Sequence, residues 1–371
     1  MSRPLARVLG LALALFGALV LASCSQLPAP RVSAFDASPA TLARGTSATL
    51  QWTLAGGAPS SVTIDQGVGD VTALSDVTVH PAATTTYTLT ALNSGGSDAR
   101  QVTVTVEADP FAITLDFASS ISSTQRAAFE SAASRWAQVV TRGLPDTVAT
   151  IQAGACSGLP TSTFNGTIDD VLISVQVGPI DGPGKVLGFG GPCYTRPSDG
   201  LTAYGIMEFD AADLTMLEQQ GLLQATILHE MGHVLGFGTL WRSLLTGGGS
   251  DNPRFTGANA VREWQALGGS GQVPVENCLD AGGAPVQDCG SGTRDAHWRE
   301  ATFGSELMTG YINVGANPMS RVTVGSLADL GYTVDYAAAD SYSLPTNVTG
   351  QSLAAATHLD FTLVTPIGSL P

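Results

Sequence analysis

Two histidines and a glutamate in the second half of the chain have the types and the spacing of a metal-dependent hydrolase. His229 and His233 are four residues apart, so on a helix their rings lie on one face and can bind one metal ion. Glu230 follows the first histidine directly, where its carboxylate can accept a proton from a metal-bound water. The pattern H-E-x-x-H on a helix is a specific signal for a zinc peptidase. We therefore expect one catalytic zinc ion, with Glu230 as the general base.

A catalytic zinc ion usually takes three protein ligands and leaves a fourth position for water. In a compact motif the third histidine would stand ten residues after His229, but Thr239 occupies that position. His297 is the best candidate that remains, because Met308 follows it closely. A histidine and then a methionine turn would complete the site if an insertion separates the second and third ligands.

Three separated segments, at 229–237, 297–298 and 306–308, together resemble the leishmanolysin family of metzincin zinc peptidases, most closely its bacterial members. The resemblance spans roughly residues 110–340. It implies that the zinc ligands are His229, His233 and His297, that Glu230 is the general base, and that Met308 forms the floor of the site.

The resemblance also implies the reaction. Zinc lowers the pKa of its water to about 7 and polarises the scissile carbonyl of a protein or peptide substrate. Glu230 would take the proton of that water and later deliver it to the leaving amine. Members of the family are typically made with a pro-segment whose free cysteine blocks zinc, but no cysteine lies between Cys24 and the catalytic segment. The alternative function is that of a surface adhesion protein acting through its N-terminal domain.

The composition bounds the possible partners. The chain has 371 residues, enough for two domains, and its 44% hydrophobic content can supply their cores. Lys and Arg number 16 against 31 Asp and Glu, a formal net charge of −15. Such a surface repels nucleic acid, so we expect no nucleic-acid partner and a monomeric protein.

The N-terminal residues have the pattern of an export signal. An apolar run at 9–21 follows two arginines, and it is too short to span a bilayer comfortably. Residues 21–24 resemble a bacterial lipobox, which implies that 1–23 are a lipoprotein signal peptide and that Cys24 carries the lipid. A secretory signal with a chance cysteine is the alternative. With 24–34 as a linker, we expect a lipid-anchored protein of the bacterial cell envelope, facing the periplasm or the exterior.

Four cysteines remain after Cys24, an even number in an exported protein, and they allow three disulfide connectivities. Local pairing favours Cys278–Cys289, which leaves Cys156–Cys193. A zinc site built from cysteines is the rival interpretation, but the chain has no C-x-x-C pair.

Residues 35–107 form a separate unit in the sequence. Short runs of alternating apolar and polar residues are separated by Gly and Asn clusters, a pattern typical of an all-β sandwich. The segment resembles bacterial Ig-like domains. We expect Trp52 in its core and His80 in a loop.

Residues 108–344 are expected to form an α+β metzincin-type catalytic domain, giving a multidomain protein. The strands and helices that we expect in it are a strand at 113–117, a helix from Ser122 or Ser123 to about Val140, a central strand at 170–177, a loop at 178–200, and the active-site helix at about 221–235. In metzincins the segment corresponding to 204–210 is the antiparallel edge strand of the sheet. An extended peptide can add to such an edge through main-chain hydrogen bonds.

Residues 240–296 are the expected insertion between the second and third zinc ligands. It contains a short helix at 258–267, and its cysteine loop returns the chain to His297. Asp251, Asn252 and Asp280 are possible calcium ligands, although their spacing is not regular. A short C-terminal helix is expected at 326–331, and 345–371 form a tail in which His358 is a surface residue.

Overall fold

The structure, a computed structural model, describes residues 27–42, 46–156, 161–184, 186–280, 282–286, 289, 292–346, 356–358 and 364–370. The predicted signal peptide and Cys24 lie outside the described residues. The chain divides into two compact units, residues 1–108 and 109–371. Within the residues that the structure describes, none of the helices has both the length and the apolar composition that crossing a membrane would require.

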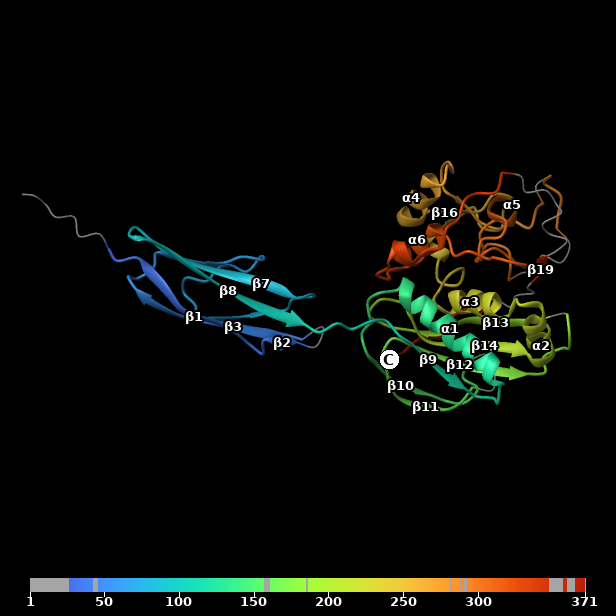
Figure 1. The fold of residues 1–371 in the computed structure, drawn as a ribbon, viewed down its shortest axis with the longest axis horizontal. Coiled ribbons are helices and arrows are strands. Elements are labelled where there is room, and N and C mark those ends of the chain that lie inside the picture. Colours follow the sequence, from blue (N-terminus) through green and yellow to red (C-terminus); the bar gives the residue numbers. More distant parts are fainter. Residues whose placement is uncertain are drawn as a thin grey trace, which may run out of the picture. The chain divides into compact units, whose positions relative to one another are not determined.

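The N-terminal unit is rich in β-structure (Figure 1). One sheet has the order β1-β3-β6, and the other has the order β2-β8-β7-β4-β5. Their bounds are β1 Pro30–Ser38, β2 Thr41–Leu42, β3 Ala48–Gly56, β4 Ser61–Ile64, β5 Gly69–Asp70, β6 Asp76–Val79, β7 Thr85–Asn93 and β8 Gly96–Val106.

Alternating side chains from both sheets of this unit form one core. Leu50 of β3 and Leu89 of β7 are fully buried, because successive residues of a strand point to opposite faces. The prediction that Trp52 is a core residue is confirmed, since it packs edge-on against Phe35 with the ring centroids 6.5 Å apart. His80 is exposed outside the strands, as expected.

The second unit is a mixed α/β structure built on a five-stranded sheet with the order β20-β13-β14-β12-β9. Strands β9, β12 and β14 are parallel, and β13 runs antiparallel to β14. The bounds are β9 Ile113–Phe117, β12 Val171–Gly178, β13 Gly188–Thr195, β14 Thr202–Asp210 and β20 Gly368–Ser369.

The expected position of the antiparallel edge strand is wrong. The segment 204–210 belongs to β14, a parallel strand that has a neighbour on each side. The antiparallel strand is β13, which lies within 178–200, the segment expected to be a loop. Glycines make up much of β13, so the strand has little of the apolar alternation from which strands are predicted.

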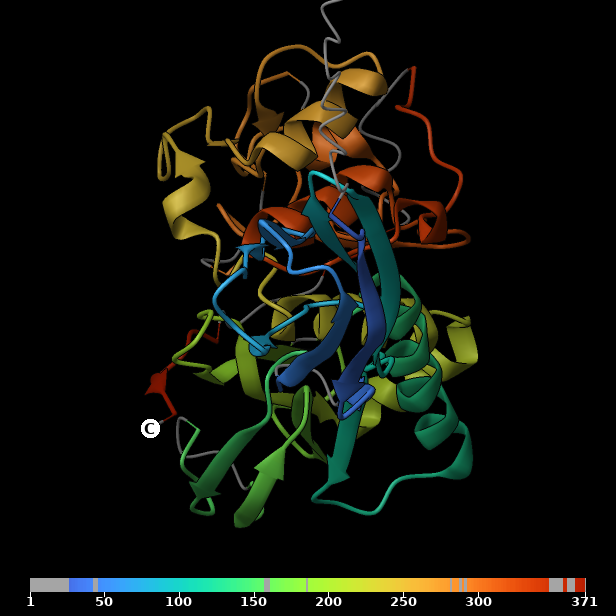
Figure 2. The ribbon, with the colours of Figure 1, turned by 90° about the vertical axis from the view of Figure 1, so that its left-hand side faces the viewer.

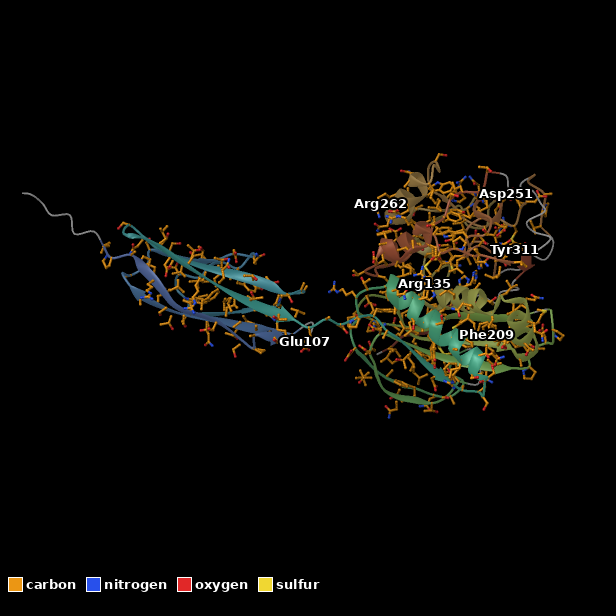
Figure 3. The ribbon with its side chains drawn as sticks, in the orientation of Figure 1. Glu107, Arg135, Phe209, Asp251, Arg262 and Tyr311 are labelled. Carbon is orange, nitrogen blue, oxygen red and sulfur yellow. A yellow bond between two sulfur atoms is a disulfide. The ribbon has the colours of Figure 1, made fainter. Side chains whose placement is uncertain are left out.

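Helices α1 (Ser123–Val139) and α3 (Leu223–Val234) pack together in the main core of this unit. Ser122 caps α1 with a capping box, so the helix begins where the sequence predicts. Phe129 of α1 packs edge-on against Phe209 of β14, with the ring centroids 5.5 Å apart. Figure 3 labels Phe209. These contacts fix the helices to the sheet.

Figures 1 and 2 show α3 between the sheet and the segments that follow it in the sequence. Arg135 of α1, labelled in Figure 3, forms an ion pair at 3.0 Å with Asp340, which lies in the segment after α6. The remaining elements are β10 Thr147–Ile151, β11 Phe164–Ile168, α2 Ala211–Gln220, the 3-10 helix η1 Arg242–Leu244, β15 Leu245–Thr246, β16 Arg254–Phe255, α4 Ala258–Ala266, β17 Val273–Pro274, α5 Glu300–Phe303, β18 Tyr311–Asn313, α6 Arg321–Leu330, the 3-10 helix η2 Tyr336–Ala338 and β19 Ala356–His358.

Two short strands of the C-terminal tail pair with the catalytic unit. The backbone of β19 pairs antiparallel with β18, and β20 pairs parallel with Tyr194 and Thr195 of β13. Helix α6 is longer than the helix expected at 326–331, because it begins earlier, directly after its N-cap Ser320. The side chain of His358 lies outside the described residues.

Two disulfides are present, and they join the pairs that local pairing favours. Cys156 bonds to Cys193, and Cys278 bonds to Cys289. The first closes a separation of 37 residues and the second a separation of 11 residues. The second disulfide lies in the insertion that precedes His297.

Candidate metal centre

Helix α3 presents His229 and His233 on one face, as their spacing predicts. The helix is buried on most sides by apolar residues such as Ile227 and Met231. Gly236, with φ of 109°, then reverses the chain, and this turn brings the Phe237 carbonyl back to the His233 ring. Only glycine adopts such a backbone without strain.

His297 reaches the same place from the segment after the insertion. An isolated bridge pairs Trp298 with Val275, and the Glu276 amide donates to the His297 carbonyl at 2.9 Å. The Nε2 atoms of His297 and His233 lie 3.0 Å apart, and those of His297 and His229 lie 3.2 Å apart. The two helical Nε2 atoms are 3.0 Å apart. Three imidazoles therefore converge through the same type of nitrogen.

The hydrogen bonds at the other ring nitrogens decide what these three Nε2 atoms can do. Each Nδ1 lies against a main-chain carbonyl oxygen: His229 on Leu307 at 2.7 Å, His233 on Phe237 at 2.8 Å, and His297 on Thr293 at 3.0 Å. A carbonyl can only accept, so each Nδ1 carries the proton. In the neutral rings the three Nε2 lone pairs then face one another, an arrangement that needs a cation between them.

The donor set fits zinc. Nitrogen ligands bind zinc at about 2.0–2.1 Å in tetrahedral geometry, which places two ligand nitrogens about 3.3 Å apart. The observed separations of 3.0–3.2 Å are close to that value. Among the described residues, these histidines are also the one group without a disulfide that could hold a metal.

Burial governs the electrostatics of the centre. The three histidines and Glu230 are almost completely buried. Burial lowers the pKa of His233 to about 4 and holds the pKa of His229 well below its usual value, with the neighbouring His233 adding to the effect. Burial raises the pKa of Glu230, against the effect of a hydrogen bond from the Gly190 amide. Neutral imidazoles are the form that ligates a metal.

Glu230 belongs to α3, and its backbone packs against the antiparallel strand β13. A methyl group at Gly190 would lie 2.6 Å from the Glu230 carbonyl oxygen, so only glycine lets the strand approach the helix this closely. The Oε2 atom of Glu230 is buried and makes no hydrogen bond to the described residues. This oxygen can accept a proton from a water molecule.

Met308 packs directly under the H-E-x-x-H segment. A methyl group at Gly232, which stands between the two helical histidines, would lie 2.9 Å from both Sδ and Cε of Met308. Met308 is fully buried, and its amide and carbonyl both make hydrogen bonds within the fold. The methionine therefore forms an apolar surface below the metal centre, where its flexible thioether can fill an irregular space.

The predicted calcium ligands do not form a comparable group. Asn252 Oδ1 accepts hydrogen bonds from the side chains of Arg254 and Arg299. Asp251 is exposed and lies 3.8 Å from Arg294, while Asp280 Oδ1 accepts from the amides of its own turn. The oxygens of Asn252 and Asp251 thus lie near arginine side chains, and Oδ1 of Asp280 lies near main-chain amides.

The geometry defines the class of a zinc metallopeptidase, and comparison with known proteins gives the family. The family model of leishmanolysin, peptidase M8, matches residues 137–355, more than half of the chain. The chain belongs to the leishmanolysin family of zinc-dependent peptidases. A search of curated proteins finds no match.

Several groups that shape the centre could not be predicted from the sequence. The main-chain carbonyls that hold the Nδ1 atoms have no side-chain signal at all. Gly232 could have been suspected because it lies within the H-E-x-x-H helix, where glycine is otherwise unfavourable, whereas Gly190 lies in a segment that was expected to be a loop. Glu306, next to the methionine turn, is a buried carboxylate whose contacts appear only in the structure.

Proposed function

We propose that the protein is a metzincin-type zinc endopeptidase in which His229, His233 and His297 hold one zinc ion. The observation that carries the proposal is the convergence of three Nε2 atoms whose rings are fixed as Nδ1-H tautomers by main-chain carbonyls. Membership of a zinc-dependent peptidase family supports the same function.

The residues of the chain divide the chemistry between them. When bound, zinc would polarise the scissile carbonyl and make a water molecule more acidic. Glu230 is the general base that takes the proton of the attacking water and returns it to the leaving amine. Glu230 is buried within α3, away from bulk water, and the Gly190 amide donates a hydrogen bond to its carboxylate.

Strand β13 is the proposed docking strand for the substrate backbone. It is the antiparallel strand of the sheet, and its Gly190 lies against Glu230. Because β20 pairs with Tyr194 and Thr195, the proposed docking segment is the beginning of the strand, at 188–190. An extended peptide can add to a sheet edge through main-chain hydrogen bonds, which leaves the choice of side chain to pockets. Because this mode holds the main chain, which all proteins share, we expect the substrates to be proteins or peptides.

Glu230→Ala tests the proposed mechanism. Because a general base contributes about 10²–10⁴-fold to rate, casein hydrolysis should fall by about that factor while zinc stays bound. A chelator should abolish hydrolysis by the unmodified protein, and added zinc should restore it. Glu130→Gln, a change on the exposed face of α1, is the control and should leave the rate unchanged. Cleavage that neither the substitution nor the chelator affects would refute the zinc mechanism, and a lack of hydrolysis by the unmodified protein loaded with zinc would favour the adhesion alternative.

The proposed location is the bacterial cell envelope, with the lipid on Cys24 as anchor and an Ig-like domain at 35–107 between anchor and enzyme. The lipobox-like sequence and the two sheets around one core support this arrangement. Cys24→Ser should move the protein from the membrane fraction to the soluble fraction on cell fractionation. Membrane association unchanged by Cys24→Ser would contradict the lipid anchor.

A further inference from the structure

Glu306 is a fully buried carboxylate that lies two residues before Met308. Its Oε2 accepts a hydrogen bond from the Met308 amide at 2.6 Å. Its Oε1 accepts from the Ser320 amide at 2.9 Å, from the Ser320 hydroxyl at 2.7 Å and from the Thr323 hydroxyl at 2.5 Å. Both oxygens are therefore acceptors, one toward the methionine turn and one toward the start of α6.

The main-chain groups next to this contact reach two of the three histidines. The Leu307 carbonyl accepts from Nδ1 of His229 at 2.7 Å. The Met308 carbonyl accepts from the Trp298 amide at 2.9 Å, directly after His297. Fixing the Met308 amide thus fixes the two carbonyl groups that orient these ligands.

The second oxygen of Glu306 connects the turn to the rest of the fold. Ser320 is the N-cap of α6, and Thr323 accepts a hydrogen bond from Trp298 Nε1 at 2.9 Å. Glu306, Thr323 and Trp298 therefore close a ring of contacts around the methionine turn. A carboxylate fits this position because it accepts at both oxygens, whereas an amide would present one donor to another donor.

Resting on the function proposed above, we propose that Glu306 is a positioning residue of the metal centre. Its carboxylate sets the main chain at Leu307 and Met308 so that His229 keeps the orientation and tautomer that zinc binding requires. Groups that orient metal ligands from outside the coordination sphere typically change metal affinity by about 10–100-fold when they are replaced.

Glu263 offers a matched control. It is also a buried carboxylate, and it pairs with Arg321 in the first turn of α6 at 2.6 Å and with Arg262 of its own helix, α4, at 3.0 Å. None of these contacts involves the methionine turn. Glu263→Gln therefore tests what the loss of a buried carboxylate beside α6 does by itself.

The experiment measures zinc affinity in the full chain by competition with a chromophoric chelator, together with the visible spectrum of the cobalt(II) form. Glu306→Gln should weaken zinc binding by about 10–100-fold and alter the cobalt spectrum. Glu263→Gln should leave both unchanged. Circular dichroism of each variant establishes that it is folded. Thr323→Val removes one donor to Glu306 and the acceptor of Trp298 Nε1, two links of the same ring of contacts, and should weaken zinc binding by a smaller factor.

Each outcome decides the proposal. Folded Glu306→Gln with the zinc affinity of the unmodified protein would overturn it, as would an equal loss in Glu263→Gln. If Glu306→Gln does not fold, Thr323→Val decides, because unchanged affinity in that variant contradicts the proposal and reduced affinity supports it. An unmodified protein that binds no zinc would overturn the proposed function itself. This failure is distinguishable from failure of the Glu306 proposal, because it is measured on the unmodified protein, whereas the role of Glu306 is measured on the variants.

Discussion

At the metal centre, the orientation of each imidazole is set by a main-chain carbonyl oxygen. The three acceptors belong to Phe237, Thr293 and Leu307, which come from three different segments of the chain. A side-chain substitution cannot delete such an acceptor, but it can move the backbone that carries it. The centre is therefore most sensitive to residues that fix the backbone nearby, including its glycines.

Gly190→Ala should disrupt the contact between β13 and α3. The added methyl group would lie 2.6 Å from the Glu230 carbonyl oxygen and 3.1 Å from its carbon, and backbone atoms cannot move aside as a flexible side chain can. Overpacking of this kind costs about 1–3 kcal/mol, so the free energy of unfolding in urea should fall by about that amount. Casein hydrolysis should fall as well, because Glu230 moves with the helix.

Gly166→Ala is the control for this prediction. Its methyl group would meet the Phe164 ring at 3.5 Å, an ordinary van der Waals contact, on strand β11. Stability and hydrolysis should both stay near those of the unmodified protein. If the two alanine variants behave alike, the close approach at Gly190 does not matter for the site.

The residues that could be predicted from sequence are those whose side chains carry the chemistry at a fixed local spacing. His229, Glu230 and His233 are of this kind, since a single helix turn brings them together. The structure places His297 beside them, although the order of the chain alone gives no distance across the insertion. Glu306 could not be predicted, because a glutamate next to an apolar turn gives no sign of the four hydrogen bonds it accepts.

Elements were predictable where the local pattern and the burial agree. Helix α1 has both a capping box and an apolar stripe, and β12 has the near-continuous apolar run of a strand buried on both faces. Strand β13 was missed because its burial depends on glycines that make room for α3 and for the tail residue Val364. That requirement is set by neighbouring elements, so it leaves no periodic signal within the strand.

The two disulfides should differ in how much they contribute to zinc binding and to the free energy of unfolding. The chain-entropy model assigns about 3 kcal/mol of stability to a loop of 11 residues and about 4 kcal/mol to one of 37 residues. The smaller loop begins at Cys278, whose amide donates to Glu276 at 2.6 Å, and the Glu276 amide in turn donates to the His297 carbonyl at 2.9 Å. The smaller loop is therefore linked to a metal ligand.

Replacing Cys278 and Cys289 by serine should weaken zinc binding more than replacing Cys156 and Cys193 does. The order should be reversed for stability, because the Cys156–Cys193 pair closes the longer loop. Zinc competition and urea unfolding of the two double variants provide the comparison. Zinc binding that is weakened equally in both variants, or more by the loss of Cys156–Cys193, would show that the smaller loop does not support His297 through Glu276.

For the molecule as a whole, buried carboxyl groups make stability depend on pH in an unusual direction. Glu300 in α5 is only 4% exposed, and its carboxyl group lies near the side chains of Thr309 and Asn313. Burial, with a contribution from the charge of nearby Glu276, raises its pKa from 4.5 to about 8. The folded protein therefore keeps the Glu300 proton over a pH range in which the unfolded chain has lost it.

The sign of the effect follows from this difference in bound protons. Between pH values of about 4.5 and 8 the folded state binds more protons at Glu300 than the unfolded state does, so stability falls as the pH rises through this range. Each pKa unit corresponds to about 1.4 kcal/mol, so the decline is on the order of a few kcal/mol. Glu300→Gln stays neutral at every pH and should remove this part of the decline.

Urea unfolding at about pH 5, 6, 7 and 8 measures how the free energy of unfolding differs between the unmodified protein and Glu300→Gln. The unmodified protein should lose stability relative to Glu300→Gln as the pH rises, whereas the exposed change Glu218→Gln should run parallel to the unmodified protein. Other carboxyl groups with raised pKa values, such as Glu208, contribute the same slope to both proteins and cancel in the difference. A constant difference across the range would mean that Glu300 is ionised in the folded protein, and that its surroundings supply hydrogen bonds that compensate its burial.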